Sequence, residues 1–174
     1  LASTLTDIAG ASDWFDQSWV TYANEAKVNE LGVDPEELAS KGAVSAQVAI
    51  MMAKGALKRA EANFAISVTG IAGPTNEGSK KPVGTVYVGI ASHTGWANAI
   101  RTQIGGTRAE NKAGFVYFAL LTAMKCWDDA MRRREQDEQD LLDAAAEALR
   151  LEEEREAERV RRDQEAREQA PWQD

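Results

Sequence analysis

The chain has 174 residues with 44% apolar content, so it can bury one globular core and still carry an appendage. Residues 1–127 hold 11 Lys and Arg against 11 Asp and Glu, whereas residues 128–174 hold 9 against 17, so the net charge of −8 lies in the tail. A neutral body and an acidic tail argue against a nucleic-acid-binding protein, because such proteins neutralise phosphates with a basic face.

Cysteine and histidine are scarce. Cys126 is the single cysteine, which excludes an internal disulfide and a cysteine-based metal site. His93 is the only histidine, and no carboxylates are placed near it in the sequence, so no metal site is predicted. The chain has no apolar run long enough to cross a bilayer and no signal-peptide pattern at its start. We therefore expect a cytoplasmic protein with no membrane partner.

The first part of the chain is mainly helical in pattern. Gly10 suits the left-handed residue that ends a helix. Asp34, followed by Pro35 and Glu37, is a strong helix start, and Ser45 is the expected N-cap of the next helix. In chain order we predict a helix end at residues 1–8, a strand at 17–22, a helix at 23–31, and helices from Pro35 and from Ser45.

The second part is extended and then helical. Residues 63–70, 84–92 and 95–104 are three apolar extended runs, and the last two are separated by a hairpin turn at His93. Thr107 and Glu110 form a capping box that opens a long helix. This order predicts an α/β domain with three layers, α/β/α, and a mixed β-sheet, because the hairpin requires at least one antiparallel pair.

The tail from residue 128 is rich in Ala, Glu, Arg, Asp, Gln and Leu and has no Gly or Pro before Pro171. Such residues favour a helix, and alternating charges at helical spacing support it. Its apolar positions do not keep a heptad over several turns, so a solvated charged helix is favoured over a dimerising coiled coil. We place the domain boundary between residues 127 and 128.

A glycine- and proline-rich turn at residues 69–74 (TGIAGP) follows an apolar run and precedes PVGTV at residues 82–86. Together with TDIAGAS (6–12), VTYANEAK (20–27) and KGAVS (41–45), it resembles the CinA C-terminal domain family of nicotinamide-nucleotide amidohydrolases. The resemblance covers residues 1 to about 125 and implies a five-stranded mixed sheet between helices. It also implies that no cofactor or metal is needed.

One motif of that family has no counterpart here. The family opens with a strand that ends in a Glu-Ser-Cys-Thr-Gly-Gly turn, whose serine is the expected nucleophile, whereas this chain starts at Leu1 with the following helix already under way. We expect a fragment or truncated gene product, and a sheet without that strand should expose an unpaired edge. The chain as given is then expected to bind the nucleotide without turning it over.

Tyr22 and Lys27 lie on either side of the expected strand-to-helix junction. A lysine held near a helix N-terminus has a lowered pKa and can accept a proton from a serine, with the tyrosine hydroxyl as a relay. Without the resemblance, a solvated lysine and a packed tyrosine are the simpler interpretation. The resemblance places the Tyr and Lys of the family at these two positions.

Other candidates gather around the glycine-rich turn. Thr69 and the backbone amides after it are expected to stabilise an oxyanion or hold a phosphate, although a β-branched residue can simply end a strand. Asn24 is either a substrate contact or a helix N-cap. Arg108 is expected to hold a 5′-phosphate, and the alternative is a surface arginine paired with an acid. The expected substrate-binding residues are Asn24, Gly70, Ala72, Gly73 and Arg108, and the expected catalytic residues are Lys27, Tyr22 and Thr69.

The resemblance implies hydrolysis of nicotinamide mononucleotide to nicotinic acid mononucleotide and ammonia. We expect a small-molecule nucleotide as the partner and a homo-oligomer, by preference a dimer, as the assembly. A second hypothesis is a non-catalytic nucleotide-binding or oligomerisation module whose acidic helical tail recruits a partner. A third is a remnant that does not fold alone.

Overall fold

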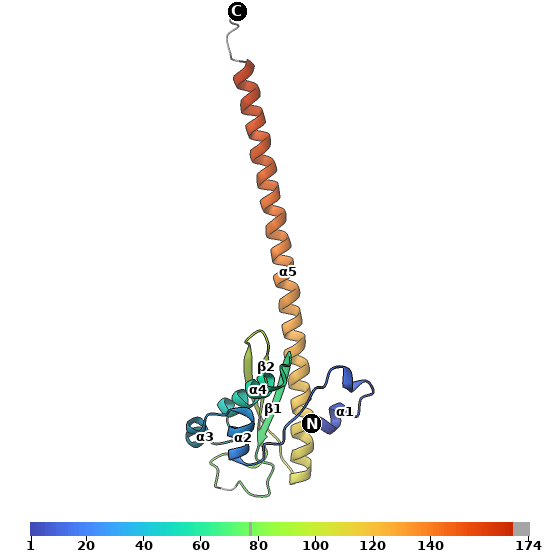
Figure 1. The fold of residues 1–174 in the computed structure, drawn as a ribbon, viewed down its shortest axis with the longest axis vertical. Helices are drawn as coiled ribbons and strands as arrows, with labels where there is room; N and C mark the ends of the chain where they lie inside the picture. The colour runs from blue at the N-terminus through green and yellow to red at the C-terminus, as the bar shows by residue number, and fades with distance from the viewer. Residues whose placement is uncertain (77, 169–174) are drawn as a thin grey trace, which may run out of the picture. The chain divides into compact units, whose positions relative to one another are not determined.

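The computed structural model describes residues 1–76 and 78–168 and divides the chain into two compact units, Leu1–Cys126 and the part from Trp127 onward. Figure 1 shows the fold and labels α1 to α5, β1 and β2. In chain order the elements are α1 (Ala2–Thr6), the 3-10 helix η1 (Ala11–Asp13), α2 (Asn24–Leu31), α3 (Pro35–Lys41), α4 (Ala46–Ala60), β1 (Phe64–Gly70), β2 (Thr85–Ser92), β3 (Ala97–Gln103) and α5 (Arg108–Glu168).

The sheet lies in the first unit and has the order β1-β2-β3. Both pairs are antiparallel, with Val88 of β2 opposite Val68 of β1 and Ile100 of β3. The expected hairpin between β2 and β3 is confirmed, and its turn closes with a hydrogen bond from the Gly95 amide to the Ser92 carbonyl (3.1 Å). The predicted α/β class is therefore confirmed.

The strand predicted at residues 17–22 is wrong, because this segment is extended coil and pairs with no strand in the described part of the chain. A strand needs a neighbour that exchanges backbone hydrogen bonds with it. Here the carbonyls of Thr21 and Tyr22 accept hydrogen bonds from a lysine side chain instead. Without this strand, the sheet of the described residues is antiparallel throughout and not mixed, and β1 is an edge strand.

Helix α4 packs against one face of the sheet, and its backbone lies close to the strands. Ser67 of β1 donates a hydrogen bond from its hydroxyl to the Ala49 carbonyl of α4 (2.6 Å). A Cβ atom at Gly89 would lie 2.2 Å from the same carbonyl oxygen. The small residues of the strands therefore let the helix backbone approach the sheet.

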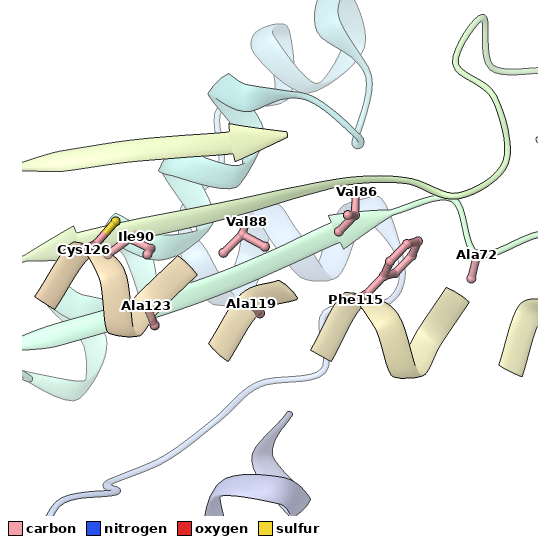
Figure 2. Close-up of a cluster of buried hydrophobic side chains, with 8 residues drawn as sticks. All are labelled: Ala72, Val86, Val88, Ile90, Phe115, Ala119, Ala123 and Cys126. Atoms are coloured by element: carbon pink, nitrogen blue, oxygen red, sulfur yellow. The ribbon is translucent and has the colours of Figure 1, made fainter. Parts of the chain in front are cut away.

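The other face of the sheet is covered by the first turns of α5, which completes the three layers. Figure 2 shows the cluster, in which side chains of β2 lie against those of the helix. Val86, Val88 and Ile90 alternate along β2 toward this face, and all three are buried. The remaining members of the cluster are Ala72, Phe115, Ala119, Ala123 and Cys126.

The helix starts follow the predicted caps. The Asp34 carboxylate accepts a hydrogen bond from the Glu36 amide (2.8 Å), and the Ser45 hydroxyl accepts one from the Val48 amide (3.3 Å). The capping box of α5 is also present, because the Glu110 carboxylate accepts hydrogen bonds from the amide and hydroxyl of Thr107, both at 2.7 Å. These bonds, the backbone one first, lower the pKa of Glu110.

The second unit is the continuation of α5 beyond Cys126. Its described side chains are almost all exposed, and ion pairs at helical spacing connect several of them, such as Arg162 with Glu158 (2.6 Å). Within residues 1–76 and 78–168, no helix is both long and apolar enough to cross a membrane.

Candidate functional site

Lys27 is the buried cation of the first unit. Helix α2 begins at Asn24, and the Lys27 side chain folds back beyond that start, as the tilt of Cα–Cβ bonds toward the helix N-terminus allows. Its ammonium nitrogen donates to the carbonyls of Thr21 (2.8 Å) and Tyr22 (3.1 Å). Only 6% of the residue is exposed. The segment just before α2 therefore forms a backbone cradle for this side chain.

Burial lowers the pKa of Lys27 from its usual value of 10.5, because desolvation penalises the charged form. No carboxylate forms an ion pair with it among the described residues. After the ammonium group has given up one proton, the two carbonyls can hold its two remaining hydrogens. The lone pair is then left to accept a proton, which is the arrangement that a general base requires.

Arg108 connects the glycine-rich turn with the segment before α2. Its Nη1 donates to the Gly73 carbonyl (2.8 Å), and its Nη2 lies 3.5 Å from the Tyr22 hydroxyl, at the outer limit of a hydrogen bond. The Tyr22 side chain is largely exposed. The guanidinium has five N–H donors, so these two contacts leave others for an anion.

Thr69 is buried at the end of β1, and its hydroxyl donates to the Ala43 carbonyl (2.8 Å). The Ile71 amide donates to the Thr85 carbonyl (2.8 Å), which extends the pairing of β1 with β2. Among the described residues, the amides of Ala72 and Gly73 have no acceptor. Those two amides are the candidates for binding an oxyanion or phosphate.

The glycines of this turn are needed for steric reasons. A Cβ at Gly70 would lie 2.7 Å from the Phe115 ring and 2.9 Å from the Thr85 carbonyl oxygen. Gly73 has a φ of 89°, which L side chains rarely adopt, and a Cβ there would meet Val83 at 2.7 Å. Packing therefore accounts for both glycines, whether or not a ligand contacts the turn.

Asn24 is not the helix cap that one interpretation of the sequence expected. The N-cap of α2 is Ala23, which makes no side-chain capping hydrogen bond, and Asn24 is the exposed first helical residue. The N-cap interpretation is wrong because the helix begins one residue earlier than a cap at Asn24 would place it. The substrate contact stays a prediction.

Asn111 was missed by the sequence analysis. It is fully buried, and its Nδ2 donates to the carbonyls of Ala72 (3.0 Å) and Gly106 (3.1 Å), so it joins the turn to the start of α5. Its Oδ1 accepts no hydrogen bond from any described residue. The signal was available, since Asn111 occupies the same helix stripe as Phe115 and Ala119, four and eight residues later.

The structure thus links Tyr22, Lys27, Gly73 and Arg108 through direct hydrogen bonds. In the described part of the chain, Thr69 and Asn24 form no hydrogen bond with this group. In the same residues, no cluster of three or more His, Cys, Asp or Glu side chains could hold a metal ion.

Comparison with known proteins identifies the family. The sequence model of the CinA C-terminal domain family matches residues 1–127. The chain belongs to the CinA C-terminal domain family. The nicotinamide-nucleotide amidohydrolase PncC of Escherichia coli K12 is 45% identical over 122 residues, which cover 70% of this chain and 74% of that protein. A CinA-like protein of Chlorobium limicola is 48% identical over 127 residues, which are 71% of this chain and 30% of that longer protein.

The fold of this family member agrees with solved structures. The competence/damage inducible protein CihA of Agrobacterium tumefaciens superimposes with a TM-score of 0.68 and 43% identity, over 71% of this chain and 76% of that one. A CinA superfamily protein of Escherichia coli gives 0.67 and 31%, over 72% of each chain. The family match ends at residue 127 and leaves the tail outside it.

Proposed function

We propose that residues 1–127 bind nicotinamide mononucleotide and form the site at which its carboxamide is hydrolysed to nicotinic acid mononucleotide and ammonia. The observation that carries this proposal is the buried Lys27 side chain, whose nitrogen donates hydrogen bonds to the backbone carbonyls of Thr21 and Tyr22 and has no carboxylate partner among the described residues. The name of the PncC relatives supports the choice of substrate.

In the proposed reaction, the serine hydroxyl of the family's Glu-Ser-Cys-Thr-Gly-Gly segment attacks the carboxamide carbon, and Lys27 takes the proton of that hydroxyl. The negative oxygen of the tetrahedral intermediate accepts hydrogen bonds from the amides of Ala72 and Gly73. Collapse breaks the C–N bond, and the proton returns to the leaving nitrogen, which departs as ammonia. Water then attacks the acyl-serine ester, with Lys27 again as the base, and releases the carboxylic acid and the free serine.

Arg108 and Tyr22 would orient the substrate. The remaining guanidinium donors of Arg108 suit the two-pronged recognition of a 5′-phosphate. The exposed Tyr22 hydroxyl, next to that guanidinium, is placed to relay a proton or contact the substrate. The Asn24 side chain at the start of α2 is a further substrate contact in this proposal.

A second candidate is a nucleotide-binding module without catalysis. Calorimetric titration with nicotinamide mononucleotide and an ammonia assay separate the two. We expect the 174-residue chain to bind the nucleotide and to release no ammonia. Adding the family's segment before Leu1 should restore ammonia release.

Lys27→Met in the chain with the added segment should then reduce turnover by about 10²- to 10⁴-fold, as for loss of a general base. Lys54→Met, at an exposed lysine of α4, is the matched control. Turnover within a few-fold of the parent after Lys27→Met would remove the proposed role of this lysine. Failure to bind the nucleotide at all would contradict both candidates.

A further inference from the structure

The tail helix carries a straight apolar stripe. Met131, Leu142, Leu149 and Val160 are all exposed, by 39%, 60%, 59% and 46%. They are separated by 11, 7 and 11 residues. At about 100° per residue these spacings bring all four to within roughly 20° of one another around the helix, because eighteen residues make five whole turns. We call these four residues the seam.

The seam has no heptad repeat, and its members are 7 or 11 residues apart along the helix. A helix that is exposed on every side has little to stabilise it except its own side-chain pairs. A row of large exposed apolar side chains therefore marks a surface whose burial by a partner would be stabilising. Leu149, Ala157 and Val160 also line a shallow open depression together with Glu153 and Glu156.

The charges beside the seam are nearly all of one sign. Within about 60° of the mean direction of the seam lie six acids and one base, Arg167, while Arg134 lies just outside this range. Arg161 also lines the depression beside Leu149 and Val160. The six acids are Asp128, Glu135, Glu138, Glu153, Glu156 and Asp163. Of these six acids, only Glu156 forms an ion pair with a described residue, Arg159, at 2.7 Å. The other five carboxylates are left for a partner.

We propose that the seam binds a basic amphipathic helix of a partner protein, whose apolar stripe packs on the seam and whose Lys and Arg residues pair with the flanking carboxylates. A second copy of the seam would bring acids against acids, and nucleic acids or anionic membranes would be repelled. The surface lies beyond residue 127, where the family match ends, so it is a property of this chain and not of the CinA C-terminal domain.

The test uses the full 174-residue chain and a labelled synthetic helical peptide with leucines at positions i, i+3, i+7 and i+10, flanked by lysines. Fluorescence anisotropy should detect binding that weakens as salt rises. The same peptide with glutamates in place of the lysines should not bind. Absence of binding by the lysine peptide, or equal binding by both, would overturn the proposal.

Matched variants decide whether the seam itself binds. Leu149→Asp should weaken binding about tenfold or more. Leu151→Asp, on the opposite side of the helix and 48% exposed, should leave it unchanged. Glu153→Lys should weaken binding more than Glu154→Lys, although both change the net charge equally. Circular dichroism checks that each variant keeps its helix.

Two outcomes of these variants would also overturn the proposal. Equal effects within a pair would show only non-specific attraction to an acidic tail. Sedimentation that reveals a dimer lost in Leu149→Asp but kept in Leu151→Asp would show that the seam binds a second copy instead.

Discussion

Arg108 is the residue at which phosphate recognition can be separated from structural support. Its Nη1 holds the Gly73 carbonyl at 2.8 Å. We expect Arg108→Lys to weaken binding of nicotinamide mononucleotide by about ten- to a hundredfold, the equivalent of roughly 1.5–3 kcal/mol, because a point charge cannot reproduce a two-pronged contact. Affinity for the phosphate-free nucleoside should hardly change. Equal losses for both ligands in calorimetry would mean that Arg108 only supports the turn.

The buried Lys27 should make the free energy of unfolding depend on pH. Its folded pKa lies below its unfolded value of 10.5, so in that interval the unfolded chain binds more protons. Burying the charge costs stability at neutral pH, and this cost is relieved as pH rises toward 10.5. Compared with Lys27→Met, the wild-type chain should therefore gain free energy of unfolding between neutral and alkaline pH. Urea unfolding across this range checks the trend, and a constant difference would contradict it.

At the scale of elements, the approach of α4 to the sheet depends on Gly89. A Cβ there would lie 2.2 Å from the Ala49 carbonyl oxygen and 2.6 Å from the Ser67 hydroxyl. We expect Gly89→Ala to destabilise the fold by about 1–3 kcal/mol, because a helix backbone must shift to make room. Gly105→Ala, where a Cβ would meet nothing within 4 Å, is the control. Similar urea midpoints for the two variants would show that α4 adjusts freely.

At the scale of the whole molecule, the two units should be stabilised independently. Both buried clusters of the described residues lie within residues 1–126. Removing residues 131–174 should therefore shift the melting temperature by less than about 4 °C, the order expected for 1 kcal/mol in a domain of this size. Differential scanning calorimetry measures this shift. A much larger fall would show that the tail stabilises the body.

Local signals determined much of the fold. The caps at Asp34, Ser45 and Thr107 were predicted because a helix start depends on a few neighbouring residues. The hairpin was predicted because a turn between two apolar runs brings adjacent strands together. The family resemblance rested on residue blocks, and the comparisons confirm it over residues 1–127.

Other features depend on contacts between residues far apart in the chain. The segment 17–22 has the composition of a strand, but strand pairing requires a neighbour, and none joins it in the described structure. The pairing of Arg108 with Gly73 and the buried Asn111 amide connect residues 35 and 39 positions apart. The sequence alone determined which side chains were available, whereas the tertiary structure decided which of them were buried, paired or left exposed, because burial and hydrogen bonding are set by distant neighbours.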